Sequence, residues 1–212
     1  MLAKRENGRT GTILGRKGAQ TRARLLAATR ELLQTVSPFQ LTVVAIAKAA
    51  QTASATLYVY FDDVEHVLYE LCEEACHEFS EMLARHPGWF TDRENIAEHV
   101  ERFIEEYNRV WDRHSHVLLY RNLEADRGNL RFLDVRTLTA MPIVHLLAAA
   151  IQAARPGLTE LQAQSDAIVL YSAVERLAGT RRNYATMGRG MPFDELMQAQ
   201  IRVIIGHLVL PS

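Results

Sequence analysis

The chain has 212 residues, of which 48% are hydrophobic and 23% are charged, a composition typical of a folded globular protein and not of a disordered chain. It contains no run of eighteen apolar residues and begins with a polar, basic segment, so we expect neither a membrane span nor a secretory signal, and no membrane partner. With only two cysteines, Cys72 and Cys76, a disulfide scaffold is excluded and a reducing, cytoplasmic location is expected.

The charge of the chain is unevenly distributed. Residues 1–61 hold nine basic and two acidic residues, a net charge of +7, whereas the remainder carries −8, and together they give the overall −1. A basic segment fused to an acidic one indicates that only the first part meets a polyanion. Nucleic acid and an anionic membrane surface both fit the charge alone.

Hydrophobic periodicity predicts helices along the whole chain. Residues 1–17 contain three glycines and no apolar period, so they are interpreted as a flexible basic arm. A helix then follows from Gly18 to about Val36, and Ser37-Pro38 ends it. Short helices are predicted at about 42–49, with Thr42 as N-cap, and at 53–59, and a long helix at 63–85.

The second half has the same character. One helix begins at Thr91 or Asp92 and includes Trp111, and less regular segments cover 114–126 and 129–155, where Pro142 is expected to kink or divide the helix. Helices at about 158–186 and 192–209 complete an all-α fold. We divide it into the arm 1–17, a DNA-binding domain 18–68 and a C-terminal domain 69–212.

The two short helices have the pattern of a helix-turn-helix. The first has an apolar inner face, and the second begins with the small or hydroxylated residues Ala53, Ser54, Ala55 and Thr56. Small side chains let a recognition helix approach base edges, and hydroxyl groups and tyrosines can reach phosphates. The alternative is a small helical bundle without a DNA role.

At these residues the chain resembles the N-terminal signature of the TetR family of bacterial transcriptional regulators. The resemblance rests on residues 42–50 (TVVAIAKAA) and 56–61 (TLYVYF), with Leu25-Leu26-Ala27-Ala28 fitting the first helix. It implies a three-helix DNA-binding domain, a helical domain that dimerises and binds an effector, and a homodimer that acts on a palindromic operator in double-stranded DNA. The usual mode is repression that a small molecule relieves.

The resemblance also implies which residues contact DNA. Thr42 is expected at a phosphate, Ser54, Ala55 and Thr56 at bases, and Tyr58 and Tyr60 at the backbone. The predicted interface is completed by Lys48, Thr52 and Ala53 around the turn and by Arg16 and Lys17 at the end of the arm. Three positions depart from the family pattern: Gln51 and Ala55 replace glycines, and Val64 replaces a lysine.

The C-terminal domain is expected to hold an effector. Phe103, Tyr107 and Trp111 recur at four-residue steps, which more often marks a core than a binding site. Because the family's central helices enclose a ligand cavity, we expect some of these side chains to line it, and apolar walls with few polar anchors suit a hydrophobic or amphipathic ligand. The predicted ligand-binding set is Phe103, Ile104, Tyr107, Asn108, Trp111, Tyr120, Met141, His145, Tyr171 and Val174. Glu175-Arg176 is interpreted as part of an ion pair in the core.

The last two helices are predicted to dimerise, because their apolar faces are too wide to leave in water. Two helices from each subunit would form a four-helix bundle. The predicted dimer residues are Ile168, Leu177, Phe193, Met197, Ile201, Ile204, Ile205 and Leu208. The helix at 63–85 is expected to be the lever between effector and DNA, as the only continuous element joining the two parts.

Other functions receive less support from the sequence. Cys72 and Cys76 lie in an apolar stripe and are interpreted as structural residues, and His114 and His116 do not share a helix face, so no metal or other cofactor is predicted. No catalytic constellation suggests an enzyme. A DNA-binding dimer without a ligand, controlled by a protein partner or by its abundance, stays open as an alternative.

Overall fold

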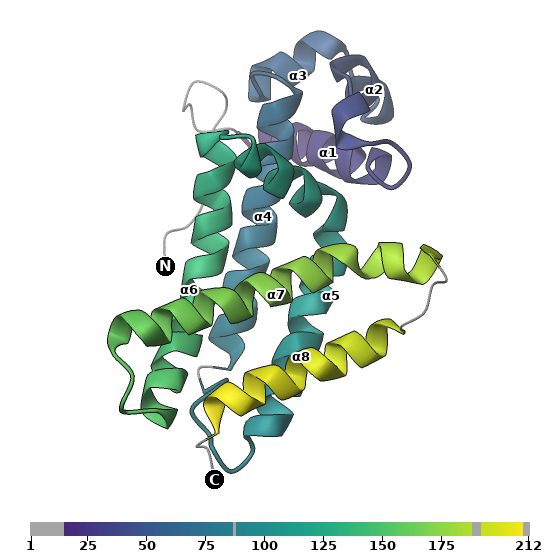
Figure 1. The fold of residues 1–212 in the computed structure, drawn as a ribbon. Coiled ribbons are helices and arrows are strands. Elements are labelled where there is room, and N and C mark those ends of the chain that lie inside the picture. Colours follow the sequence, from purple (N-terminus) through teal and green to yellow (C-terminus); the bar gives the residue numbers. More distant parts are fainter. Residues whose placement is uncertain (1–14, 87, 188–191, 210–212) are drawn as a thin grey trace.

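The computed structural model describes residues 15–86, 88–187 and 192–209, and every regular element in these ranges is a helix (Figure 1). Of residues 1–17, predicted to be a flexible arm, 1–14 lie outside the described ranges. The helices in chain order are α1 (Arg16–Leu32), the 3-10 turn η1 (Pro38–Gln40), α2 (Val43–Ala49), α3 (Ser54–Tyr60), α4 (Val64–Arg85), α5 (Ile96–Asp126), α6 (Leu130–Ala154), α7 (Glu160–Met187) and α8 (Phe193–Leu208).

Three boundaries differ from the sequence-based expectation. Helix α1 begins at Arg16, so Arg16 and Lys17 are helical and not part of an arm. Helix α5 begins at Ile96 and runs without a break to Asp126, because its buried stripe continues through Ser115 and Leu118 beyond the apolar period that we had followed to Trp111. Helix α6 likewise runs through Pro142 and is not divided there.

Helix α6 is also long and apolar enough to span a membrane by length and composition alone. The core helix of a water-soluble protein meets the same criterion, so this is weak evidence. In the structure Ile143, Leu147 and Ile151 are buried and pack in the core of the C-terminal domain.

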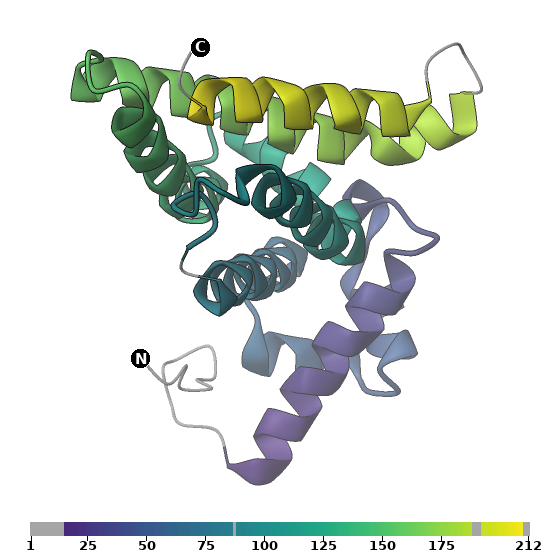
Figure 2. The ribbon, with the colours of Figure 1, turned by 90° about the horizontal axis from the view of Figure 1, so that it is seen from below.

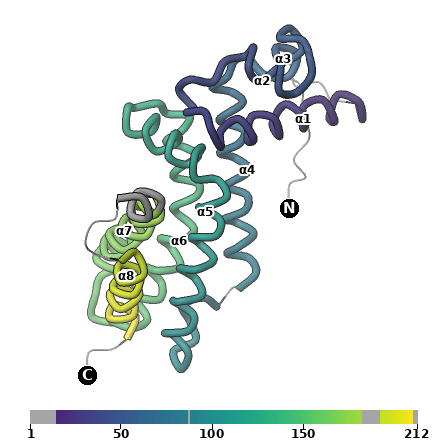
Figure 3. The backbone as a smooth tube through the Cα atoms, turned by 90° about the vertical axis from the view of Figure 1, so that its right-hand side faces the viewer, coloured from purple at the N-terminus to yellow at the C-terminus, as the bar shows by residue number. Residues whose placement is uncertain are grey.

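The molecule consists of a head and a body. Helices α1–α3 form the head at one end of α4, and α4, α5 and α6 run away from it as the body (Figure 1). Helices α7 and α8 lie side by side along one face of the body (Figure 2), and α4 lies on the opposite side (Figure 3). This arrangement leaves one broad surface made only by α7 and α8.

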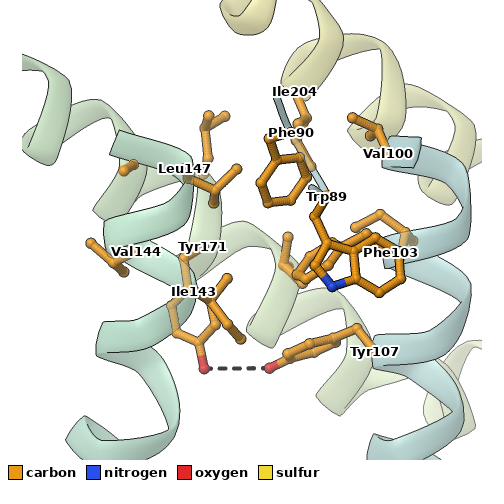
Figure 4. Close-up of a cluster of buried hydrophobic side chains, with 14 of the residues drawn as sticks. Trp89, Phe90, Val100, Phe103, Tyr107, Ile143, Val144, Leu147, Tyr171 and Ile204 are labelled. Atoms are coloured by element: carbon orange, nitrogen blue, oxygen red, sulfur yellow. Dashed lines mark hydrogen bonds between the residues drawn. The ribbon is translucent and has the colours of Figure 1, made fainter. Parts of the chain in front are cut away.

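The core of the body is rich in aromatic rings. Phe103 contacts both Trp89 and Phe90, with ring centroids 5.6 and 5.1 Å from its own (Figure 4). Tyr107 packs on Phe79 with a centroid distance of 4.9 Å. Apolar side chains of α6, α7 and α8 close this cluster from the other side. Such ring pairs prefer tilted or edge-to-face contacts, which are the geometries found here.

The core of the head extends into the body. Leu57 and Phe61 of the head share one hydrophobic cluster with Val117 and Tyr120 of α5 and Phe132 of α6. The Phe39 ring of η1 lies 5.0 Å from that of Tyr120, and Tyr120 lies 5.4 Å from Phe132. The expectation that α4 alone joins the two parts is therefore wrong, because the end of α5 also contacts the head through Phe39.

The broad apolar face of α8 turns inward. Ile201, Ile204 and Leu208 are at most 5% exposed and belong to the core of their own subunit, where α8 packs on α5, α6 and α7. Leu177, Phe193, Met197 and Ile205 are half-buried, and only Ile168 of the predicted dimer set is an exposed apolar residue. The periodicity of α8 correctly indicates a face that must be buried, but it is buried within the subunit.

The turn between α2 and α3 holds a left-handed residue that is not glycine. Gln51 has φ of 51°. The amide of Thr52 donates to the Ala47 carbonyl at 2.9 Å and that of Gln51 to the Lys48 carbonyl at 3.1 Å, which is the pair of bonds of a Schellman helix end. The turn of the family is thus retained at the cost of left-handed strain.

Replacing Gln51 by glycine is expected to raise the free energy of unfolding by up to about 1 kcal/mol, because glycine adopts the left-handed conformation without a steric penalty. Denaturant titration measures the effect. Gln51→Ala keeps the strain and serves as the control, so it should not be stabilised. A loss of stability in Gln51→Gly, with a similar loss in Gln51→Ala, would mean instead that the glutamine side chain makes a stabilising contact.

Candidate nucleic-acid interface and effector region

The first helix of the helix-turn-helix is held from both sides. The Thr42 hydroxyl accepts a hydrogen bond from the Ala45 amide at 3.1 Å, so Thr42 is the N-cap of α2, as expected. Ile46, Ala47 and Ala50 are buried against the rest of the head, whereas Val44 and Lys48 face outward. The cap leaves Thr42 itself exposed at the start of α2, where a phosphate could reach it.

Helix α3 presents the residues of a recognition helix. Leu57 and Phe61 are fully buried and fix its inner face. Ala55, Tyr58 and Val59 are exposed on the other side, and Ser54 and Thr56 are half-buried beside them. Sequence reasoning missed Val59, although it follows Ala55 by one helical turn and therefore shares its face. An exposed valine can contact a thymine methyl group in the major groove.

The remaining predicted DNA contacts lie around this helix. Ala53 and Lys48 are exposed and Thr52 is half-buried, all near the turn that precedes α3. Tyr60 is half-buried and its ring packs against the core of the head. The structure thus brings together Thr42, Lys48 and residues 52–56, while Tyr60 has a packing role in addition to any contact with DNA.

The positive charge of the head is smaller at its surface than the sequence suggests. The Arg22 guanidinium binds the Glu70 carboxylate at 2.6 Å and lies over the Phe61 ring, and Arg30 forms an ion pair with Glu74. These arginines tie α1 to α4. The exposed basic residues of the described head are Arg16, Lys17, Arg24, Arg30 and Lys48, of which Arg30 is paired with Glu74.

The acidic pair that follows α3 has a structural role. The Asp63 carboxylate accepts a hydrogen bond from the His66 amide at 2.7 Å and caps α4, where a negative charge is also favoured by the helix dipole. The His66 ring stands edge-on to the Phe61 ring and its Nδ1 accepts from the Asp62 amide at 3.2 Å. This capped corner sets the angle between the recognition helix and α4.

Most of the predicted effector residues meet in the body. Phe103, Ile104, Tyr107, Trp111, Tyr171 and Val174 are at most 4% exposed and share one core. The hydroxyl groups of Tyr107 and Tyr171 lie 3.4 Å apart (Figure 4). Burial, together with the nearby charge of Glu175, raises the pKa of both phenols, so both stay protonated at neutral pH. Asn108 is buried as well and its amide faces the Met197 sulfur at 3.9 Å.

Two predicted effector residues lie elsewhere, and one lies at the margin. Tyr120 belongs to the cluster that joins head and body, and burial raises its pKa to about 12. His145 is exposed and lines an open groove of about 560 Å³ between α6 and α7. Met141 is partly buried at the edge of the aromatic core. Helical periodicity places a residue on a face of its own helix, but it does not show which neighbouring helix covers that face.

A buried ion pair connects three helices of the body. Arg121 is fully buried, and its guanidinium binds the Glu175 carboxylate of α7 at 2.7 Å and the Thr139 hydroxyl of α6 at 3.3 Å. Glu175 was expected to form an ion pair in the core, and it does, with an arginine that sequence reasoning had not singled out. Arg176 is exposed.

The cysteines and histidines do not form a metal site in the described part of the chain, where no group of three or more potential ligands gathers. Cys72 is buried, and burial raises the pKa of its thiol to about 12, so it is a neutral thiol at physiological pH. Its sulfur lies 3.7 Å from the Val117 carbonyl, at the junction of head and body.

Comparison with known proteins agrees with this geometry. Residues 25–71, which include α2 and α3, match the bacterial regulatory proteins of the tetR family. The fold, the exposed recognition helix and this match indicate a helix-turn-helix transcriptional regulator that binds DNA. The N-terminal motif had indicated this family, and the match confirms it for residues 25–71. A comparison with curated protein sequences finds no match.

Solved structures share the fold over almost the whole chain. The fatty acid degradation regulator FadR from Bacillus halodurans has 16% sequence identity and a TM-score of 0.67, covering 90% of this chain and 97% of its own. A transcriptional regulator from Rhodococcus sp. Rha1 has 17% identity and the same score, covering 90% and 99%. Thermus thermophilus FadR, a TetR family transcriptional repressor in complex with lauroyl-CoA, has 18% identity and a score of 0.59, covering 90% and 96%.

Substitutions in the head should separate base contacts from phosphate contacts. Ser54→Ala and Thr56→Ala are expected to change discrimination between related operators by about 1 kcal/mol or more each. Lys17→Ala and Lys48→Ala should weaken binding to all operator sequences alike. They should also lower the slope of log affinity against log salt concentration by about one per lost phosphate contact. Titrations at several salt concentrations measure both effects, with Arg109→Ala on the exposed surface of α5 as control. Equal weakening on all sequences by Thr56→Ala would argue against a base contact.

Proposed function

We propose that the protein is a homodimeric repressor that binds a palindromic operator and is released from it by a small hydrophobic or amphipathic ligand held in the body. Two-fold symmetry of the dimer would present two copies of α3 to two major-groove half-sites. Such a regulator works in the cytoplasm, where the DNA lies. The observation that carries the proposal is an apolar strip left exposed on α7 and α8.

The strip consists of aliphatic side chains on the outer surface of the two helices. On α7, Leu161, Ile168 and Val169 are 72%, 46% and 68% exposed, and on α8 Val203 is 52% exposed. Val209 continues the strip directly after α8. Since the inner faces of both helices already pack on the body, a second copy of the chain is the partner that lets both helices bury their outer faces in a four-helix bundle. This set replaces most of the residues predicted from periodicity.

Two observations support a ligand. The structurally similar Thermus thermophilus FadR is described in complex with lauroyl-CoA, a molecule with an apolar chain and a polar end. In the present chain, the predicted apolar residues of the body do gather, and Tyr107, Tyr171 and the Arg121–Glu175 pair provide polar groups among them.

A second candidate is a dimeric regulator that binds no small molecule. It is favoured by the close packing of Phe79, Phe103, Tyr107 and Trp111, whose successive ring centroids lie within 6.2 Å of a neighbour. An effector that enters this cluster has to displace rings. The effector experiment below distinguishes the two candidates.

The dimer surface can be tested by placing charge on the exposed strip. Val169→Glu combined with Val203→Glu is expected to give a folded monomer, because burying an unpaired carboxylate in an interface costs about 3 kcal/mol or more. Sedimentation measures the mass. Leu130→Glu, at a residue 70% exposed at the start of α6, is the control and should remain dimeric. A dimer that persists in the double variant would refute this interface. Ile201→Glu should instead unfold the subunit.

The effector model makes a thermodynamic prediction. A ligand that weakens operator binding must bind the free dimer more tightly than the DNA-bound dimer by the same factor. Calorimetric titration of dodecanoate and dodecanoyl-CoA into the free protein and into its operator complex measures both affinities. Tight binding to both forms with equal affinity would contradict release by these ligands, and absence of binding would favour the second candidate.

A further inference from the structure

A pocket of about 400 Å³ lies at the surface between α5, α6 and α7, apart from the packed aromatic core. Its volume is within the range of small-molecule sites. Leu119 and Leu123 give it an apolar wall, and they are 40% and 51% exposed. The remaining lining residues are Trp111, Asn122, Asp126, Arg136, Ser172, Glu175, Arg176 and Gly179.

The pocket reaches a buried hydrogen-bond donor without a partner. Trp111 is 1% exposed, and its Nε1 has no hydrogen-bond partner among the described residues. A buried N–H group left unpaired costs about 1–3 kcal/mol, so such a group calls for an acceptor.

Because Gly179 has no side chain, the pocket lies directly beside the Trp111 indole. A Cβ atom at Gly179 would lie 3.3 Å from Cζ2 and 3.9 Å from Cε2 of Trp111, and Cε2 is bonded to Nε1. The same atom would lie 3.5 Å from the Leu119 side chain. Gly179 therefore lies against the benzo ring of the indole, at the carbon next to the one bonded to Nε1.

The two carboxylates and the side-chain amide in the wall of the pocket already bind arginines. The Glu175 carboxylate binds Arg121 at 2.7 Å, and the Asp126 carboxylate binds Arg136 at 2.5 Å. The Asn122 side-chain oxygen accepts hydrogen bonds from Arg121 at 2.9 and 3.0 Å.

The Ser172 hydroxyl donates to the Ile168 carbonyl at 2.7 Å and keeps its oxygen as an acceptor, whereas the charged group that remains is a donor. The guanidinium of Arg176, at the rim, has no ion-pair partner among the described residues. With the Trp111 N–H group, it offers positive charge and a hydrogen-bond donor beside an apolar wall.

We infer that this pocket binds an amphipathic molecule whose polar end is a hydrogen-bond acceptor, such as a carboxylate or carbonyl oxygen. The acceptor lies at the Trp111 N–H group and near Arg176, and the apolar part lies against Leu119 and Leu123. This inference rests on the proposed function, to which it adds a place and a chemical class of ligand. Because Glu175 lines the pocket and holds Arg121, a ligand here contacts the ion pair that connects α5, α6 and α7.

Tryptophan fluorescence tests the contact directly. The chain has two tryptophans, Trp89 and Trp111, so Trp89→Phe leaves Trp111 as the single reporter. Titration with dodecanoate is expected to change the Trp111 emission saturably, whereas dodecyltrimethylammonium, with the same chain and no acceptor, should bind at least about tenfold more weakly. Calorimetry on the unaltered chain repeats the comparison in case Trp89→Phe does not fold. Equal binding of both amphiphiles, or of neither, overturns the inference.

Two further variants locate the site. Gly179→Ala narrows the pocket at the indole. It is expected to weaken the binding of dodecanoate by roughly tenfold, in line with the effect of one carbon atom in a fitted pocket. Gly157→Ala is the matched control, since a Cβ there would have nothing within 4 Å. Thermal unfolding of both variants checks that they fold. Unchanged affinity in a folded Gly179→Ala variant would show that dodecanoate binds elsewhere.

Measurement of operator release separates this inference from the proposed function. Saturable binding at Trp111 without loss of operator affinity would support the pocket and contradict relief of repression by such a ligand. Operator release by dodecanoate, with unchanged Trp111 emission and full affinity in Gly179→Ala, would support the proposed function and overturn the pocket.

Discussion

The orientation of the recognition helix depends on a hydrophobic core that the DNA-binding head shares with the body. Leu57 and Phe61, which hold α3, are packed in the same cluster as Tyr120 of α5 and Phe132 of α6. Closely packed interiors do not deform continuously, so a shift at the end of α5, where Tyr120 contacts Phe39, has to be followed by the head. The head is therefore coupled to the body through both α4 and α5.

The buried ion pair of Arg121 and Glu175 gives this core its second constraint. Removing a guanidinium from water is costly, and the cost is offset only when its hydrogen bonds are satisfied, as they are here by Glu175, Asn122 and Thr139. Arg121 lies one residue after Tyr120 on α5 and contacts side chains of both α6 and α7. Whatever alters the position of Glu175 on α7 thus acts close to the junction with the head. The path from the proposed pocket to the DNA is short for this reason.

The two faces of α7 and α8 have different roles, because one face is buried and the other is exposed. The inner faces complete the core of the subunit, and the outer faces keep an aliphatic strip around Ile168, Val169 and Val203. The proposed pocket and the proposed dimer surface therefore share helix α7. A ligand beside Arg176 lies one to two helical turns from Val169, which gives a direct route by which binding could change the angle between subunits.

The sequence by itself determined the helical fold, the helix-turn-helix and its cap at Thr42, because these depend on local signals: a 3.6-residue period, a hydroxyl at a helix start, and a family motif. It also identified Gln51 as a strained position. It did not show that α5 and α6 each run on as a single long helix, since tertiary packing stabilises a weak local pattern. Only the tertiary structure decided which apolar faces meet within the subunit. Ile201 and Ile204, predicted at the dimer interface, lie in the core, and Tyr120, predicted at the effector, lies at the junction of head and body. Arg121, which the sequence had not singled out, is the partner of Glu175. The physical reason is that periodicity records how much apolar surface must be covered, whereas the helix that covers it is set by contacts distant in the chain.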